Sequence, residues 1–376
     1  MVALAILAVV SLTGWISVLL ETARAWDLRP IAEDEPAPPD PERWPSVAVL
    51  VPARNEAELL PSTLPSLLAQ DYPGAWRVVL VDDRSTDGTA DAARTCGVEP
   101  VRGSELPAGW VGKVWALEQA AAQAGEPDYF LLTDADIRHA PHSLRRLVSE
   151  SEAGGLALNS RMARLRCRSR AERLLIPPFL LFFNLLYPMR RVNDPGSRVA
   201  GAAGGCVLLR REALERAGGL AAIRDRVIDD VSLARAVKGL GEPIRLAVSR
   251  SDVESLRDHD LGGVWRMVRR TAFTELRHSW VLLAATLALL VLLFPLPPLL
   301  AATGVGLVST AGADAASLLL LVAAVLAWAA MTAAYLPTVR YFGLARAWSL
   351  TLPLAGCLYG AMTLDSALRG RRPAWS

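Results

Sequence analysis

The sequence predicts an α/β domain, with a mostly parallel sheet flanked by helices, between apolar segments long enough to span a membrane. Through the middle of the chain, short β-branched apolar runs alternate with stretches of helical periodicity, an order typical of parallel sheets. Hydrophobic residues make up 52% of the 376 residues, the mean hydropathy is +0.29, and the excess lies at the two ends. A soluble domain held by membrane segments on both sides accounts for this distribution.

The chain opens with an apolar run, residues 2–20, which is close to the ~20 residues that cross a bilayer as a helix. No basic region precedes the run and no clean small-residue cleavage site follows it, so residues 1–22 are predicted to be a retained anchor. Arg24 and Arg29 follow and predict a cytoplasmic location for the next domain. Residues 23–45, rich in Pro, Asp and Glu, are expected to be a linker.

Residues 46–279 are predicted to form the α/β domain. The expected strands are residues 47–51, 77–81, 98–101, 129–133, 155–162 and 244–248. The expected helices are residues 61–70, 89–95, 112–124, 141–150 and 231–238. An open sheet of this kind binds ligands at the carboxyl ends of its strands.

One segment inside this domain, residues 174–189, has a different character. Its core, residues 174–186, is almost uninterruptedly apolar, but at about 13 residues it is too short to cross a bilayer. Two interpretations are open. The segment is either a buried helix or an interfacial helix that lies on the membrane between flanking arginines.

The C-terminal region, residues 280–368, is predicted to contain two or three membrane segments. The candidates are residues 280–303, 315–336 and, less apolar, 347–364. Arg340 and Arg346 indicate a cytoplasmic loop before the third candidate, whereas the basic tail, residues 369–376, would lie outside if all three cross. The sequence therefore leaves the number of crossings open.

Charge and cysteine content exclude several classes of function. The net charge is +2, with basic and acidic residues interleaved, so no basic patch indicates nucleic-acid binding. The four cysteines are widely spaced and form no Cys-x-x-Cys pair. A disulfide framework and a structural zinc site are both disfavoured, and a reducing compartment fits better.

Three acidic clusters carry most of the chemical information. They are Asp82 with Asp83, Asp134 with Asp136, and Asp229 with Asp230. The first two follow predicted strands directly, which is where a metal-bridged diphosphate would bind, because carboxylate oxygens suit hard cations such as Mg²⁺ or Mn²⁺. Each cluster alone also fits a turn or a helix cap, but three in this order favour a site.

The third cluster precedes the helix predicted at residues 231–238, so one carboxylate could cap it while the other acts as a general base. Lys113 stands at the start of another predicted helix, where a cation and free N–H groups can meet phosphate; the alternative is a solvated lysine. Gly204 and Gly205 would let the backbone approach a sugar or diphosphate, or would simply allow close packing.

With these residues assembled, the chain resembles the family 2 glycosyltransferases, inverting enzymes with the GT-A fold. Pro52, Arg54 and Glu56 match the opening motif that frames the nucleotide base, and Asp83 matches the aspartate that contacts the base. Asp134 and Asp136 match the Asp-x-Asp motif, which implies that both bind the metal and that Asp134 also contacts the nucleotide-sugar. Asp230 matches the catalytic base.

The resemblance implies a metal-dependent enzyme, with Mg²⁺ or Mn²⁺, that uses a nucleoside-diphosphate sugar, expected to be a UDP-sugar. The run Arg266-Met267-Val268-Arg269-Arg270 resembles the (Q/R)xxRW element of membrane-bound members, with Arg270 in place of Trp. That departure argues against processive polymer synthesis. Arg266 and Arg269 are expected to stabilise the diphosphate or, alternatively, to face lipid headgroups.

A more specific resemblance is to the hopanoid-cluster (hopene-associated) glycosyltransferases of bacteria. It rests on residues 106–113, 133–141, 175–177, 203–206 and 265–268. This resemblance implies a membrane-lipid acceptor, a hopanoid among the candidates, and a multi-pass protein of the bacterial inner membrane with its catalytic domain in the cytoplasm. Transfer to a polyprenyl phosphate, or an inactive membrane scaffold or lipid carrier, are the alternatives.

Overall fold

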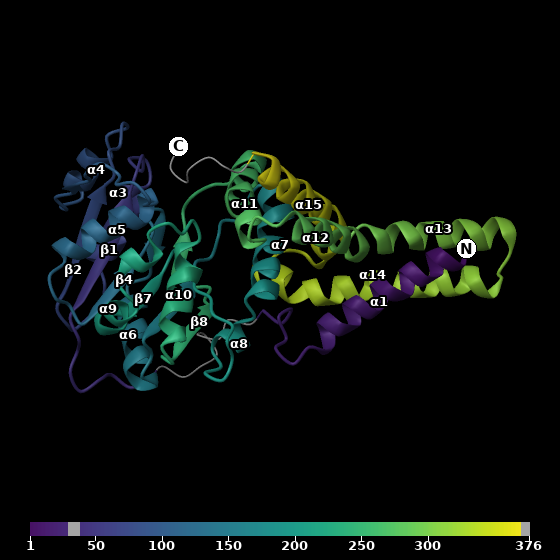
Figure 1. Cartoon of the computed structure of the whole chain (residues 1–376), viewed down its shortest axis with the longest axis horizontal. Helices are drawn as coiled ribbons and strands as arrows, with labels where there is room; N and C mark the ends of the chain where they lie inside the picture. The colour runs from purple at the N-terminus through teal and green to yellow at the C-terminus, as the bar shows by residue number, and fades with distance from the viewer. Residues whose placement is uncertain (29–37, 370–376) are drawn as a thin grey trace. The chain divides into compact units, whose positions relative to one another are not determined.

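The computed structural model describes residues 1–28 and 38–369, and these fall into two compact units (Figure 1). The sheet unit comprises residues 38–166 and 189–258, and the helical unit comprises residues 1–28, 167–188 and 259–369. Residues 167–188 and 259–279 therefore cluster with the terminal helices. Arg29, the Pro-rich part of the predicted linker and the basic tail from residue 370 lie outside the described residues.

The sheet unit is built on a seven-stranded sheet of order β3-β2-β1-β4-β7-β6-β8. Its strands are β1 (Val47–Ala53), β2 (Trp76–Asp82), β3 (Val101–Arg102), β4 (Tyr129–Leu132), β6 (Leu158–Met162), β7 (Val207–Arg210) and β8 (Ile244–Val248). All run parallel except β7, which is antiparallel to both of its neighbours. A separate antiparallel pair joins β5 (Ile137–His139) to β9 (Val253–Ser255).

Helices cover both faces of the sheet. They are α3 (Leu60–Leu68), α4 (Thr89–Thr95), α5 (Gly112–Gln123), α6 (Ser143–Gly154), α8 (Met189–Val192), α9 (Arg211–Arg216), the 3₁₀ helix η1 (Leu220–Ile223) and α10 (Asp229–Gly239). Every residue of β1 is buried, as expected for a central strand shielded on two sides.

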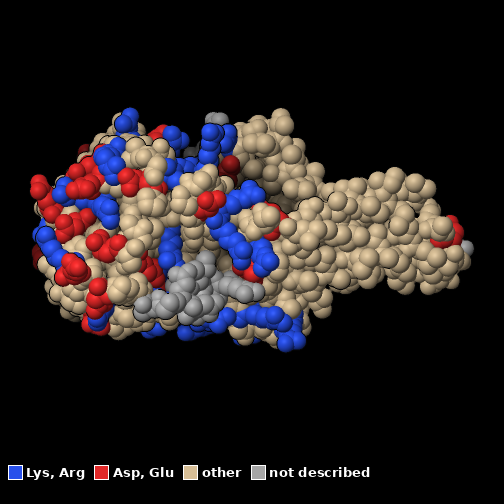
Figure 2. Space-filling view, turned by 90° about the horizontal axis from the view of Figure 1, so that it is seen from below, with Lys and Arg blue, Asp and Glu red and all other residues tan. Residues whose placement is uncertain are grey.

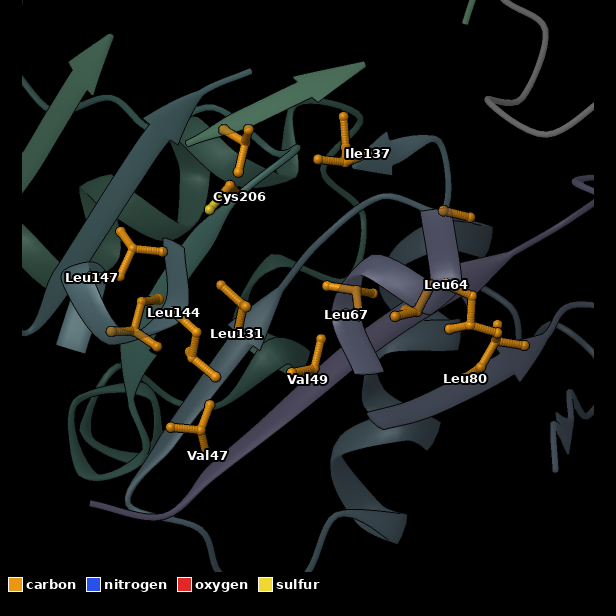
Figure 3. Close-up of a cluster of buried hydrophobic side chains, with 14 of the residues drawn as sticks. Val47, Val49, Leu64, Leu67, Leu80, Leu131, Ile137, Leu144, Leu147 and Cys206 are labelled. Atoms are coloured by element: carbon orange, nitrogen blue, oxygen red, sulfur yellow. The ribbon is translucent and has the colours of Figure 1, made fainter. Parts of the chain in front are cut away.

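The main core lies on one of these faces. Val47 and Val49 of β1, with Leu131 of β4, pack there against side chains of α3 and α6 such as Leu64 and Leu144 (Figure 3). Side chains alternate along a strand, so the even-numbered residues of β1 point to the other face. Helices α5 and α10, which carry Lys113, Asp229 and Asp230, pack against strands of the same sheet.

The helical unit contains α1 (Val2–Leu20), α7 (Arg170–Leu186), α11 (Leu261–Glu275), α12 (Trp280–Leu293), α13 (Leu296–Ala311), α14 (Ala315–Tyr341), η2 (Arg346–Thr351) and α15 (Leu352–Arg369). Three stretches are long and apolar enough to cross a membrane, namely Val2–Leu20, Ala315–Tyr341 and Arg346–Arg369. The pair α12 and α13 meets the same criteria together but is bent by 43°. Figure 2 shows the surface around α13 and α14 almost without charged side chains.

The short apolar segment at residues 174–186 is helical, as part of α7, and one of its faces is buried inside the helical unit. Leu181 packs in a cluster with Trp15, Phe294 and Tyr335, and the side-chain amide of Asn184 donates to the carbonyl of Ala25 at 2.5 Å. A capping box at Ser169 starts the helix. Protein rather than solvent therefore surrounds much of this segment.

Three predicted elements differ from those observed, for local reasons. The strand expected at residues 98–101 is reduced to β3, because Gly97 turns the chain with φ of 86°. The strand expected from residue 155 begins at Leu158, because Gly155 ends α6 in the left-handed region with φ of 59°. The span expected at residues 280–303 breaks at Pro295, where the ring cannot continue a helix.

Candidate active site

The carboxyl ends of three parallel neighbours, β1, β2 and β4, lie at one edge of the sheet. The residues that follow β2 and β4 are hydrogen-bonded to the backbone of β1. The N–H of Asp83 donates to the carbonyl of Ala53 at 2.8 Å, and the N–H of Thr133 donates to the carbonyl of Leu50 at 3.2 Å. The first two acidic clusters are thereby fixed beside the loop that follows β1.

In the first cluster the two aspartates have separate environments. Asp82 Oδ1 accepts from the N–H of Ser85 at 3.1 Å, the turn role expected of this sequence. Asp83 is buried, and its carboxylate lies 3.5 Å from the guanidinium of Arg54. Two residues in left-handed conformation, Asn55 and Arg84, each with φ of 56°, shape the facing loops. The structure thus pairs Arg54 with Asp83, two predicted nucleotide contacts.

The second residue of the Asp-x-Asp motif lies beside Glu56. Both carboxylates contact Arg257, whose Nε donates to Asp136 Oδ2 at 3.1 Å and whose terminal nitrogen donates to Glu56 Oε1. Ser255 Oγ also donates to Asp136 Oδ2, at 3.0 Å. Burial raises the pKa of Glu56 above its ordinary value, although the neighbouring Arg257 opposes the shift.

The first residue of that motif belongs to a different group, centred on Lys113. The Lys113 ammonium lies 2.7 Å from Asp134 Oδ1 and 3.4 Å from Asp229 Oδ2. Desolvation acts to lower the pKa of Lys113, but the charges of Asp134 and Asp229 outweigh it, and the pKa is raised. Lys113 is therefore cationic, and it joins the predicted metal motif to the third acidic cluster.

Asp230 occupies the inner position of that cluster. Its Oδ2 accepts from the N–H of Gly204 at 2.7 Å, and its Oδ1 accepts from the N–H of Val231 at 2.8 Å. Desolvation and the adjacent charge of Asp229 raise its pKa to about 7, against the lowering effect of Lys113. A carboxyl group that titrates near neutral pH is suited to accept a proton.

The helix-capping role considered for this cluster is not the one observed. Helix α10 begins at Asp229, and Ile228 at the cap position accepts no side-chain hydrogen bond, although Asp230 inside the first turn accepts from the N–H of Val231. Asp229 instead faces Lys113. Likewise, the helix after the Asp-x-Asp motif begins at Ser143 with His142 at its cap position, so the motif does not cap it.

The two glycines behave differently. A Cβ on Gly204 would lie 3.0 Å from Lys113 Nζ and 3.3 Å from Asp230 Oδ2, so a side chain here would intrude on the charged group. A Cβ on Gly205 would meet Ile137 at 3.2 Å, which is the close-packing alternative. Gly204 is therefore the one that borders the site.

These groups line one pocket of the sheet unit. Its walls are formed by Pro52, Lys113, Leu117, Leu132, Thr133, Asp134, Gly204, Val207, Leu220, Ile223, Asp229, Asp230 and Leu233. The Asp229 side chain is only 16% exposed there, which strengthens its interaction with charge, whereas that of Asp134 is 37% exposed. Four of the predicted site residues outside the Asp-x-Asp motif, namely Pro52, Lys113, Gly204 and Asp230, thus share a pocket with Asp134.

The two predicted arginines of the C-terminal element lie in α11 of the helical unit. The Arg266 guanidinium is 4.0 Å from Asp260, and that of Arg269 is 3.8 Å from Asp365 of α15. Asp365 also accepts from the indole N–H of Trp265 at 2.8 Å. Asp260 caps the start of α11 itself, whereas Asp365 joins α11 to α15.

The carboxylate groups fit a divalent cation that also takes ligands from a substrate. Five carboxylates, those of Glu56, Asp134, Asp136, Asp229 and Asp230, face only two cations, Lys113 and Arg257. The described residues contain no group of three His, Cys, Asp or Glu side chains able to hold a metal by themselves. Mg²⁺ is commonly bound through one or two carboxylates plus phosphate oxygens and water.

Three residues of the site were not among the predicted site residues. They are Arg257, Ser255 and Asp229, the last of which pairs with Lys113. Arg257 follows β9, a strand of three residues that gives no periodic signal. The only available hint was general: a buried carboxylate needs a cation nearby.

Residues 48–218 match the family model described as Glycosyl transferase family 2. An N-acetylglucosaminyltransferase of Mesorhizobium japonicum is 32% identical over 187 residues, which cover 47% of this chain and 42% of that protein. An undecaprenyl-phosphate 4-deoxy-4-formamido-L-arabinose transferase of Serratia proteamaculans is 31% identical over 114 residues, 29% of this chain and 34% of the relative. The chain thus spans less than half the length of these curated relatives.

Among solved structures, a mannosyltransferase from Pyrobaculum calidifontis, in complex with GDP-Man and Mn²⁺, has a similar fold. Its TM-score is 0.58 at 23% identity, over 98% of both chains. At this identity the likeness shows a shared fold, and the family match covers residues 48–218. The predicted fold class, a mostly parallel sheet flanked by helices with apolar segments at both ends, is confirmed.

Proposed function

We propose that this protein is an inverting family 2 glycosyltransferase that moves a sugar from a nucleoside-diphosphate sugar to a membrane lipid. One observation carries the proposal. Lys113 lies within 2.7 Å of Asp134 and 3.4 Å of Asp229, so the predicted metal motif and the predicted base converge on a single pocket. If the two clusters only formed a turn or capped a helix, they would not need to share one cation.

Asp230 is the proposed base. Its carboxylate takes the proton of an acceptor hydroxyl while the acceptor oxygen forms a bond to the anomeric carbon of the donor. The bond from that carbon to the diphosphate oxygen breaks at the same time, and the electron pair leaves with the diphosphate. The N–H groups of Gly204 and Val231 hold the carboxylate in place, and its pKa of about 7 suits this transfer at neutral pH.

The donor side of the pocket follows from the remaining contacts. Pro52 at the end of β1, Arg54 and Glu56 after it, and Asp83 would hold the nucleotide, for which uracil is the expected base. Lys113 provides a cation for the diphosphate, to which it can turn from Asp134. A Mg²⁺ or Mn²⁺ held by Asp136 and Asp134 would neutralise charge on the leaving diphosphate.

The acceptor is proposed to be a lipid because the chain has helices that could cross a membrane. Within this class we favour a hopanoid alcohol, on the strings of sequence shared with the hopanoid-cluster enzymes. The protein is proposed to be a multi-pass protein of the bacterial inner membrane with the sheet unit in the cytoplasm. Arg24 and Arg340, which lie at or near the ends of apolar helices, favour this orientation. Arg266 and Arg269 are proposed to meet the diphosphate or lipid headgroups.

A second candidate acceptor is a polyprenyl phosphate, which the names of undecaprenyl-phosphate transferases among the relatives favour. A phosphate acceptor is already ionised and needs a base less than a hydroxyl does. Replacement of Asp230 by Asn should therefore abolish transfer to an alcohol but spare much of the transfer to a phosphate.

A donor screen tests the proposal. The full chain, purified in detergent with a bacterial lipid extract, is incubated with UDP-, GDP- and dTDP-sugars, and the released nucleoside diphosphate is measured. Lipid-dependent release from at least one donor is expected. If no donor yields lipid-dependent release, while the protein remains folded, the proposed activity is wrong and the inactive-scaffold alternative is favoured.

A further inference from the structure

A single guanidinium, that of Arg257, connects two carboxylates for which the motifs predict different roles. Its Nε donates to Asp136 of the metal motif at 3.1 Å, and a terminal nitrogen donates to Glu56 of the nucleotide motif. The three residues follow β9, β4 and β1 respectively. Two donors of one planar group are thus used in two directions, which the point charge of a lysine cannot reproduce.

The two oxygens of Asp136 have unequal surroundings. Oδ2 accepts both from Arg257 Nε at 3.1 Å and from Ser255 Oγ at 3.0 Å. No residue in the described part of the chain donates a hydrogen bond to Oδ1. The Asp136 side chain is only 14% exposed. One oxygen is therefore held by protein, and the other is left for a ligand.

The backbone that leads to Arg257 is hydrogen-bonded to the segment that carries Asp136. Strand β9 pairs with β5, with Ser255 opposite Ile137, and the N–H of Leu256 donates to the backbone carbonyl of Asp136 at 2.9 Å. The backbone next to Arg257 is thus bonded to the backbone of the residue whose side chain it orients.

The start of β9 is also held, by a buried ion pair. Asp252, the residue before β9, accepts from Arg161 Nε at 3.2 Å, and both side chains are fully buried. Arg161 Nη1 also donates to Asn159 at 2.8 Å. Removing one partner of such a buried pair strongly destabilises a protein. The pair therefore holds the segment that leads to Arg257.

We propose that Arg257 positions Asp136 as a metal ligand, by holding Oδ2 so that Oδ1 faces the divalent cation, and that Glu56 in turn holds Arg257. The inference rests on the proposed function, because it assigns the metal to the Asp-x-Asp motif. Arg257 is a positioning residue, since it acts through Asp136. Partners that orient a ligating carboxylate typically contribute 10- to 100-fold to metal affinity.

An alternative role for the contact between Arg257 and Asp136 predicts the opposite change in metal affinity. If Arg257 only neutralised Asp136, it would compete with the incoming cation, and its removal would tighten metal binding. Positioning predicts that removal weakens metal binding. The direction of the change therefore separates the two roles.

The test is a titration of the full chain in detergent with Mn²⁺, both alone and with saturating UDP, GDP or dTDP. Free Mn²⁺ is followed by electron paramagnetic resonance and corrected for the Mn²⁺ that the nucleotide itself binds. Arg257→Met is expected to raise the Mn²⁺ dissociation constant by about 10- to 100-fold. Arg257→Lys should also weaken binding, because it keeps the charge but cannot bond both carboxylates. Glu56→Gln should have a smaller effect, and adding it to Arg257→Met should weaken binding no further.

Arg138→Met is the matched control. Arg138 lies on β5 and pairs with Glu254 of β9, so it belongs to the same strand pair but does not contact Asp136. Its Mn²⁺ affinity should equal that of the wild type, and Asp136→Asn should abolish binding. Thermal unfolding of each variant shows whether the fold is kept.

Unchanged or tighter Mn²⁺ binding by folded Arg257→Met would overturn the positioning role, as would wild-type affinity in Arg257→Lys. A wild type that binds no Mn²⁺, either alone or with any of these nucleoside diphosphates, would overturn the metal assignment and the inference with it. If the variants weaken Mn²⁺ binding as expected but no donor releases nucleoside diphosphate, the proposed function fails and the positioning of Asp136 stands.

Discussion

Replacement of Lys113 by methionine should move the acid limb of the pH–rate profile to higher pH. Lys113 is the cation whose charge lowers the pKa of Asp230, against desolvation and Asp229, which raise it to about 7. Methionine has a similar shape but no charge. An opposite charge close by typically lowers the pKa of a carboxyl group by 1–3 units, so the pKa should rise from about 7 to roughly 8–10 without it.

The expected effect on rate follows from the ionised fraction of the base. A pKa of about 7 puts the titration of Asp230 around neutral pH, so a rise of one unit reduces the ionised fraction at pH 7 about fivefold, and each further unit reduces it about tenfold. Turnover of the variant at pH 7 should therefore fall by roughly 5- to 500-fold. It should recover in part as the pH approaches the new pKa, because the base becomes active on losing its proton.

The assay is nucleoside-diphosphate release at saturating donor between pH 5.5 and 9.5. Lys113 also faces the proposed diphosphate site, so the donor KM is expected to rise, and the midpoint of the acid limb is the informative quantity. Lys113→Arg keeps the charge and should keep the midpoint near that of the wild type. A midpoint that does not move in Lys113→Met would refute the assignment of the limb to Asp230.

Three further predictions concern the metal, the glycine and the topology. Activity should require Mg²⁺ or Mn²⁺ and vanish in excess EDTA, and undiminished turnover there would exclude the metal role of Asp134 and Asp136. Gly204→Ala should reduce turnover by roughly 10- to 100-fold without unfolding the protein, because its methyl group would lie 3.0 Å from Lys113 Nζ; Gly239→Ala, whose Cβ would meet nothing within 4 Å, should leave turnover unchanged. A cysteine introduced at the exposed Asp91 should react only with reagents that enter the cytoplasm, and labelling from outside the cell would contradict the proposed orientation.

The strands that carry the site were predictable because each is a continuous apolar run. Residues 47–51, 77–81 and 129–133 give a strong signal of this kind, and β1, β2 and β4 occupy these places. The carboxylates directly after them followed from the rule that open sheets bind ligands at these ends. For these strands, the local apolar pattern of the sequence and the observed sheet agree.

Contacts between distant segments could not be predicted in the same way. The ion pair of Lys113 with Asp229 joins α5 to α10, and Arg257 reaches Glu56 across 201 positions of sequence. Neither β5 nor β9 is long enough to show periodicity, so their pairing leaves no trace in a single sequence. The role expected for Asp229 failed for a related reason, because a nearby cation outweighed a local helix cap.

The central claim is that Asp230, rather than its neighbour, is the base of a glycosyl transfer in the pocket around Lys113. The most direct measurement compares Asp230→Asn with Asp229→Asn, for nucleotide-sugar affinity and for single-turnover transfer to lipid, with folding checked by thermal unfolding. The account predicts that Asp230→Asn binds the donor but loses about 10²- to 10⁴-fold in rate, while Asp229→Asn retains most of its activity. Near-normal transfer by Asp230→Asn, beside a folded but inactive Asp229→Asn, would contradict it.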